Sequence, residues 1–260
     1  MGAPFDIGFV YDYFVKLLPY IGISLAIVAG SIGVGLIVGF LVALPRLYRV
    51  PVLKMASQLY ASFFRGTPIL IQLFLIYYGL PELLKLISID VSKAPVLVFV
   101  ILAYGLHSGA FVSEGIRAAV SAVDRGQVEA AYAVGMSGYQ AFIRIVFPQA
   151  LAISIPILAN LIIATLKDTS LAFTLGVMEL TGKSQTLFTI SRHVVESYLA
   201  LAIVYFILSF FLERLFNLME RRLLKHEAST AKDERVPMGK KWLNRKLNAD
   251  ISLGQGGAGA

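Results

Sequence analysis

The sequence contains no cysteine, which excludes a disulfide framework, a thiolate metal site and a cysteine nucleophile. Its three histidines, His107, His193 and His226, are scattered and show no metal-ligand spacing. The phosphate loop G-x-x-x-x-G-K-[ST] is also absent, and no acid, base and nucleophile converge in any motif. We therefore expect no catalytic site, no metal site and no cofactor of its own in this chain.

Charge is scarce too. Only 15% of the 260 residues are charged, against about 25% in a soluble domain, and 57% are hydrophobic. The mean hydropathy of +0.75 predicts a chain whose solvent is largely lipid. The distribution of the net charge of +7 argues against nucleic-acid binding, because ten of the 23 Lys and Arg residues follow Glu213. Most of the others lie in short gaps between apolar runs, which is typical of the cytoplasmic side of a membrane protein.

Five apolar stretches reach the ~20 residues needed to cross a bilayer. They are residues 17–44, 55–80, 94–118, 148–167 and 198–219. The acids Asp6 and Asp12 precede the first, which argues against a removable signal peptide. We expect Pro156 to interrupt the fourth stretch, and the short apolar run 169–179 to form a half-helix or a re-entrant piece. The predicted fold class is an all-α integral membrane protein with about five transmembrane helices.

The loop charges orient these spans. Arg46, Arg49 and Lys54 follow the first stretch without any acid, whereas the charges between the second and third stretches cancel. The positive-inside bias places the first loop and the C-terminus in the cytoplasm and the N-terminus outside. We thus expect an extracytoplasmic segment at 1–16, a transmembrane domain at 17–224 and a polar, disordered cytoplasmic tail at 225–260.

The longest internal cytoplasmic loop follows the third stretch. Residues 129–134 predict one short helix, and Glu129 can hydrogen-bond at its start or pair with a basic residue of a partner protein. Gly135 can end this helix in a left-handed conformation, and Ser137 can cap a second helix at 138–147. Pro148 is expected to end that second helix. An ordinary amphipathic connector and a docking element both fit these residues.

Four spaced elements of this loop resemble a known signature. Glu129-Ala130-Ala131 is followed after three residues by Gly135, and after nine more by Ile145-Val146-Phe147-Pro148. The spacing resembles the cytoplasmic EAA signature of permeases from the ATP-binding-cassette importers, with Phe147 in place of a leucine. Three further segments are similar to the polar-amino-acid branch of that family: Arg65-Gly66-Thr67-Pro68, residues 166–171 and residues 176–180.

The resemblance implies a type I importer permease in the cytoplasmic membrane of a prokaryote, which moves a polar amino acid. It implies a separate ATPase that binds ATP and Mg and docks on a coupling helix. It also implies a second permease subunit, identical or related, and an extracytoplasmic solute-binding protein. The matching docking residues are Gln127, Glu129, Ala130, Ala131, Gly135 and Met136.

Polar residues within the spans are candidates for the transport path, because ionisable groups are costly there. They are Arg65, Thr67, Gln72, His107, Glu114, Asn160, Lys167, Asp168 and Thr169. Each also has a structural alternative. Arg65 can meet a substrate carboxylate, or pair with Glu114 or backbone carbonyls. His107 can contact substrate, or lie buried with a hydroxyl partner such as that of Ser108.

Three further alternatives stay open. Asn160 can bridge helices by hydrogen bonding. Lys167 and Asp168 can neutralise one another, or separately meet the two charges of an amino acid. Gly66 and Pro68 predict a local break in the second span. A secondary transporter or a channel would be the rival function, but neither explains the spacing of the EAA-like elements.

Overall fold

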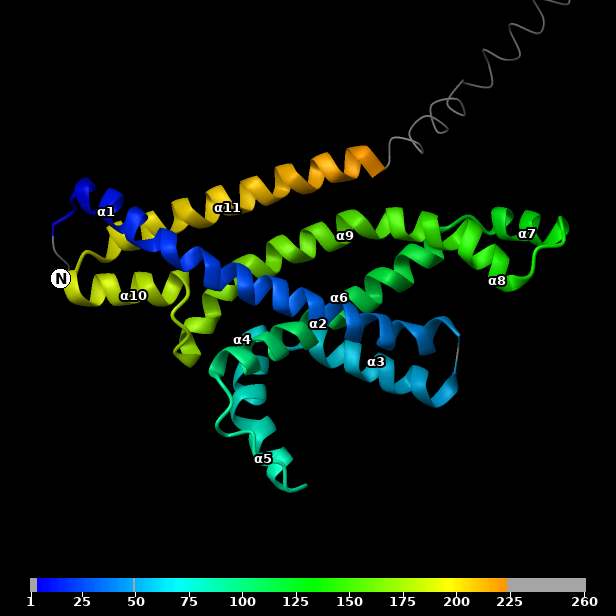
Figure 1. Ribbon diagram of the computed structural model, residues 1–260, viewed down its shortest axis with the longest axis horizontal. Coiled ribbons are helices and arrows are strands. Elements are labelled where there is room, and N and C mark those ends of the chain that lie inside the picture. The colour runs from blue at the N-terminus through cyan, green and yellow to red at the C-terminus, as the bar shows by residue number, and fades with distance from the viewer. Residues whose placement is uncertain (1–3, 49, 224–260) are drawn as a thin grey trace, which may run out of the picture. The chain divides into compact units, whose positions relative to one another are not determined.

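The structure, a computed structural model, describes residues 4–48 and 50–223 of the 260. The predicted tail at 225–260 lies outside the described residues. Within the described ranges the chain is helical and contains no strand, which confirms the all-α prediction. Residues up to Asn217 form one unit, and the packing described below is that of this unit (Figure 1).

The first span begins earlier than expected. Helix α1 (Ile7–Leu17) starts after Asp6, whose side chain accepts a hydrogen bond from the Gly8 amide at 2.8 Å. A 3₁₀ turn, η1 (Leu18–Tyr20), carries the chain directly into α2 (Ile21–Leu47). Part of the predicted extracytoplasmic segment 1–16 is therefore helix. The absence of charge from 17 onward was a poor guide to the helix start, because Asp12 and Lys16 pair on one exposed face of α1 at 2.6 Å.

The second span is broken, as Gly66 and Pro68 predicted. Helix α3 (Pro51–Gly66) is followed by α4 (Ile69–Phe74), a π-helical stretch η2 (Leu75–Gly79) and α5 (Leu80–Lys85). The axes of the two halves differ by 112°. Pro68 has no amide hydrogen and restricts the residue before it to an extended conformation, so Thr67 cannot continue the helix.

Helices α2 and α6 (Val96–Ala122) pack against each other along their length, and α9 (Phe147–Asp168) packs against α6 (Figure 1). The α2–α6 contact depends on glycine. A Cβ added to Gly39 would lie 2.5 Å from Val112 Cγ1, and one added to Gly105 would lie 2.6 Å from Val34 Cγ1. Such close backbone approach is typical of helix pairs in membranes.

The region around Pro148 differs from the prediction. Helix α7 (Arg125–Ala133) and α8 (Gly138–Ala141) are short, but α8 runs through a π-helical stretch η3 (Phe142–Val146) into α9 without ending. Pro148 directly follows the π-helical stretch, whose altered backbone bonding accommodates a residue without an amide hydrogen inside the continuous helix. Pro156 does not interrupt α9 either, because a membrane helix tolerates one lost backbone bond when its neighbours hold it.

After α9 the chain forms a 3₁₀ segment, η4 (Thr169–Leu175), which ends at Gly176 with φ +83°. This is the short apolar half-helix expected at 169–179. Helix α10 (Leu180–Ser191) was not expected; it begins at Glu179, whose carboxylate accepts a hydrogen bond from the Gly182 amide at 2.8 Å. Helix α11 (Val194–Leu223) is the last span.

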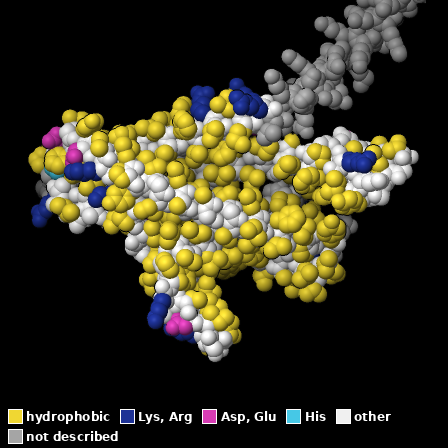
Figure 2. Space-filling model, in the orientation of Figure 1, with side chains coloured by type: hydrophobic (Ala, Val, Ile, Leu, Met, Phe, Trp, Pro, Cys, Tyr) yellow, Lys and Arg dark blue, Asp and Glu magenta, His cyan; other side chains and the backbone are white. Residues whose placement is uncertain are grey.

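Among residues 4–48 and 50–223, length and composition give four helical stretches able to cross a membrane, or five when the bent pair counts as one span. The prediction of about five spans is thus confirmed. One face of the molecule is covered mainly by hydrophobic side chains, and the charged side chains visible on it lie toward its margins (Figure 2). This distribution fits a lipid-facing surface.

Candidate functional site: a hollow beside an arginine cluster

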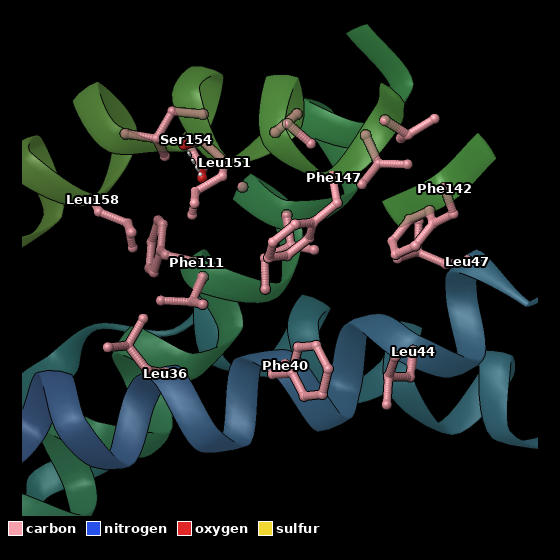
Figure 3. A pocket seen from close by; sticks show the side chains of 18 of the residues that line it. Leu36, Phe40, Leu44, Leu47, Phe111, Phe142, Phe147, Leu151, Ser154 and Leu158 are labelled. Carbon is pink, nitrogen blue, oxygen red and sulfur yellow. Dashed lines mark hydrogen bonds between the residues drawn. The ribbon is translucent and has the colours of Figure 1, made fainter. Parts of the chain in front are cut away.

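A hollow of about 1200 Å³ lies between α2, α6 and α9 and extends to α7, α8 and η3. Apolar side chains of α2 face those of η3 and α9 across it (Figure 3). Few polar side chains reach it; they include His107, Ser154, Asn160, Thr165 and Asp168. A large hollow with apolar walls and few polar groups is the usual form of a small-molecule site.

Of the candidate path residues, Gln72 and His107 meet at the break of the second span. Gln72 is 1% exposed, and its Nε2 donates to the carbonyls of Phe64 at 2.8 Å and Thr67 at 2.9 Å. Its Oε1 lies 2.9 Å from His107 Nδ1. Gln72 therefore supplies donors to carbonyls at the bend, and Thr67 Oγ1 joins the same network at 2.9 Å.

The expected hydroxyl partner of His107 was wrong. Its ring bonds the Gln72 amide instead, and the Ser108 hydroxyl is buried without a hydrogen-bond partner among the described residues. The physical reason is that neighbouring residues of a helix point in different directions, so Ser108 faces the α2 side while His107 faces the hollow.

Glu114 pairs with three arginines from three elements, which we call the arginine cluster. Its Oε2 lies 2.8 Å from Arg46 Nη2 of α2 and 3.7 Å from Arg65 Nη1 of α3. Its Oε1 accepts from Arg117 Nε at 2.9 Å, one turn along α6. Arg65 is thus paired with Glu114, which is one of the two alternatives for this residue.

The cluster carries more positive than negative charge. Three guanidinium groups surround one carboxylate, and Nη1 of Arg46 is buried without a hydrogen-bond partner within the described ranges. The side chain of Arg46 is 12% exposed, whereas those of Arg65 and Arg117 are 45% and 41% exposed. Arg65 also lies over the ring of Phe111, 5.7 Å from its centroid, and Phe111 lines the hollow.

The polar group at the end of α9 is split. Lys167 is exposed, Asp168 lines the hollow, and no ion pair within 4 Å joins them in the described part of the chain. Of the two alternatives for this pair, the neutralisation of Lys167 by Asp168 is not observed, since successive helical residues diverge. Thr169 is fully buried and donates to the Leu166 carbonyl at 2.7 Å. Asn160 is exposed and lines the hollow.

The loop that joins α6 to α9 forms a compact turn, residues 124–141, which we call the connector. Gly135 has φ +83°, the left-handed conformation that its position predicted. Ser137 caps α8, with its Oγ accepting from the Gln140 amide at 3.3 Å and its own amide donating to Gln140 Oε1 at 2.9 Å. Both predictions for this turn are confirmed.

Glu129 has a different place from the one expected. It lies within α7 and is exposed, while Asp124 is the residue at the helix start and accepts from the Gly126 amide at 2.8 Å. Of the other docking candidates, Ala131 is 4% exposed, Ala130 is exposed and Met136 is partly buried. Gln127 Oε1 accepts from Gln149 Nε2 of α9 at 2.6 Å, which ties α7 to that span.

The connector exposes large apolar side chains although the charge pattern places it outside the membrane. Tyr132 is 54% exposed, Val134 75% and Tyr139 76%. Three large apolar side chains of the connector are thus more than half exposed.

Sequence reasoning missed Asp124, Arg46, Arg117 and Glu179. Asp124 precedes a helix-forming run, so its capping role was open to prediction. Arg46 counted only as a loop charge, and Arg117 was not singled out. The contact of Arg46 with Glu114 depends on the packing of α2 and α6, which no local pattern specifies, whereas Arg117 lies three residues after Glu114 on α6 and their pairing was open to prediction.

Comparison with known proteins gives the chain a family. Residues 35–225 match the sequence profile described as "Binding-protein-dependent transport system inner membrane component". The L-cystine transport system permease protein TcyL of Bacillus subtilis (strain 168) is 44% identical over 227 residues, which cover 87% of this chain and 95% of that protein. The probable amino-acid ABC transporter permease protein PatM of Vibrio harveyi is 42% identical over 203 residues, covering 76% and 89%.

Solved structures agree with this. One described as an amino acid ABC transporter with histidines has a TM-score of 0.76 at 29% identity, covering 85% of this chain and 100% of the other. An inward-facing form of the MetNI methionine ABC transporter has a TM-score of 0.62 at 18% identity, covering 80% and 95%, and supports the fold alone. The resemblance to importer permeases is confirmed, and the chain belongs to the family of binding-protein-dependent transport system inner membrane components.

Proposed function

We propose that this chain is the permease subunit of an ATP-driven importer for polar amino acids, and that its connector docks a separate ATPase. The observation that carries the docking proposal is the geometry of the connector. A capped turn with a left-handed glycine holds α7 and α8 together, and it exposes Tyr132, Val134 and Tyr139 beside the small Ala130. Apolar side chains with small neighbours allow a partner surface to approach closely.

The connector is also mechanically linked to the spans. Helix α8 continues through η3 into α9, and the Gln127–Gln149 hydrogen bond fastens α7 to the same helix. Val123, Val146 and Ala150 form a small buried cluster with Ala119 at the base of the connector. Movement of a docked ATPase would therefore be transmitted to α6 and α9, which line the hollow.

The ATPase would supply the ATP and Mg site in this assembly. It would close around ATP and push on the connector, and the permease would contribute no step of the hydrolysis. The hollow, open in a single subunit and lined by α2, α6 and α9, would become part of an enclosed path when a second permease subunit packs beside it. An extracytoplasmic solute-binding protein would deliver the amino acid on the other side of the membrane.

The substrate class follows from the relatives. TcyL is named for L-cystine and PatM for amino acids, and both match this chain over most of its length. Cystine is therefore the first amino acid to test. The localisation that follows is the cytoplasmic membrane of a prokaryote, with the connector on the cytoplasmic side.

Reconstitution in liposomes tests the proposal. The permease is co-purified with its ATPase, and uptake of radiolabelled L-cystine and L-histidine is measured with the cognate solute-binding protein outside and ATP inside. We expect uptake only when all three components and ATP are present. Uptake driven by a proton or sodium gradient without ATP would contradict the proposal and favour a secondary transporter.

A further inference from the structure

The arginine cluster lies at the margin of the hollow. The Arg65 guanidinium lies over the Phe111 ring, and Phe111 in turn lies beside His107, with ring centroids 5.0 Å apart. Both rings line the hollow. Arg65 is thus separated from the hollow by a single aromatic side chain.

Of the three arginines, Arg65 makes the weakest contact with Glu114. Its N···O distance of 3.7 Å is longer than a hydrogen bond, whereas Arg46 lies at 2.8 Å from the same oxygen. Arg117 occupies the other oxygen through its Nε at 2.9 Å. If Arg65 turned away, Glu114 would keep two guanidinium partners, and the buried Arg46 would keep its carboxylate.

A guanidinium has five N–H donors in a planar fork that matches a carboxylate. Arg65 is 45% exposed and makes no hydrogen bond with Glu114 at its present distance, so the fork is available to another oxyanion. The hollow supplies few competing polar groups, and its apolar walls reduce screening of the charge.

We propose that Arg65 binds the carboxylate of the amino acid as it passes through the hollow. Arg65 leaves Glu114 when the carboxylate binds and pairs with Glu114 again when the carboxylate dissociates. This proposal rests on the proposed import of amino acids. The remaining members of the cluster, Arg46 and Arg117, position Glu114 and hold it in place while Arg65 is engaged.

Asp168, at the end of α9, also lines the hollow and is a second candidate contact for the amino acid. Tyr104 of α6 donates to the backbone carbonyl of Asp168, so Asp168 lies beside the Tyr104 level of that helix. Phe111 follows Tyr104 by seven residues, which is about 10 Å along a helix. The ammonium and carboxylate groups on one α-carbon are too close together to span this distance. Asp168 and Arg65 would therefore contact a single α-amino acid head group in succession, and not at the same time.

Binding to the ATP-free permease–ATPase complex in nanodiscs, without the solute-binding protein, tests the role of Arg65. The probes are radiolabelled L-cystine and L-histidine, and their carboxamides serve as competitors that lack the carboxylate. For wild type we expect the acid to compete better than the amide. For Arg65→Gln we expect about 10- to 100-fold weaker binding of the acid, as for the loss of a charged hydrogen bond, and equal competition by acid and amide. Arg65→Lys should retain part of the preference, because it keeps the charge but not the fork.

Arg214→Gln is the matched control. Arg214 of α11 lies over the Phe210 ring, 5.1 Å from its centroid, so this variant removes the same charge and the same kind of ring contact outside the hollow. Its acid preference should equal that of wild type. Co-purification of the ATPase with Arg65→Gln shows that the variant is folded.

The preference for acid over amide distinguishes recognition from packing. If Arg65→Gln weakened acid and amide equally, or kept the wild-type preference, the proposal would be wrong even though ATP-dependent uptake by the wild type stood. A wild-type complex without ATP-dependent uptake of any amino acid would contradict the proposed function, and this proposal with it.

Discussion

The connector joins α6 to α9, and the break at Thr67–Pro68 joins α3 to α4, but different contacts hold the two regions in place. The connector is held by neighbouring residues: Asp124 caps α7, Gly135 makes the turn and Ser137 caps α8. The break at Thr67–Pro68 is held from a distance, because Gln72 is buried and bonds both the bend and His107 of α6.

The difference suggests that the two regions have different functions. Local capping leaves the large side chains of the connector free to meet a partner. The buried network at the break leaves few groups free and fixes a kink beside the arginine cluster. We expect substitutions at the break to act on stability, and substitutions in the connector to act on assembly with the ATPase.

The largest effect is expected for Gln72→Leu. The substitution removes the donor from the buried carbonyl of Phe64, which costs about 1–3 kcal/mol, and from the partly buried carbonyl of Thr67. The melting temperature of the purified protein, measured by size-exclusion chromatography after heating, should fall clearly. Gln58→Leu is the control, since Gln58 is exposed on α3, and it should have little effect. Equal melting temperatures for both variants would show that Gln72 does not hold the break.

Glu114→Gln should come next. It leaves three arginines without a carboxylate, at a cost of about 1–3 kcal/mol, below the 3–5 kcal/mol of a fully buried pair because the cluster is partly exposed. Stability should fall while the ATPase still co-purifies. Glu82→Gln, which breaks an exposed pair with Lys85, should leave the melting temperature unchanged. Loss of the ATPase from Glu114→Gln at unchanged stability would contradict the proposal that this region acts on stability and the connector on assembly with the ATPase.

Gly135→Val tests the other region. A β-branched residue in the left-handed conformation is strained by about 1–2 kcal/mol, so the connector should rearrange. We expect at least about tenfold weaker ATPase association, equivalent to about 1.4 kcal/mol, with membrane insertion intact. Gly22→Ala is the control, because Gly22 lies in α2 with open space around its Cβ position. Unchanged co-purification of the ATPase with Gly135→Val would exclude the docking proposal.

Asp124→Ala should have the smallest effect. Loss of a helix N-cap costs about 1 kcal/mol and frays the first turn of α7. The affinity for the ATPase, measured by titration of the solubilised permease, should fall several-fold. Asp6→Ala removes the corresponding cap of α1. If both variants bound the ATPase equally well, α7 would not be part of the contact.

Features that depend on nearby residues were predictable from the sequence. Gly66 and Pro68 predicted the bend, Gly135 the left-handed turn and Ser137 the cap of α8, because each acts on its own backbone. Apolar length predicted the spans, although helix ends shifted by several residues.

Features that depend on packing were not predictable in the same way. The π-helical stretch η3 allows the helix to continue through Pro148, although a proline inside a helix usually predicts its end. The Gln72 partner of His107 and the contact of Arg46 with Glu114 require α2, α4 and α6 to be in place. Helix α10 was missed because its apolar residues are interspersed with polar ones that match no simple period.

The central claim is that the connector contacts an ATPase, and site-specific photo-crosslinking tests it most directly. A photoreactive residue replaces Val134, which is 75% exposed on the connector, or Ile190, which is 80% exposed on α10. In the co-purified complex we predict a cross-link to the ATPase from position 134 and none from position 190. A complex that imports amino acids with ATP but cross-links from position 190 and not from position 134 would contradict the account.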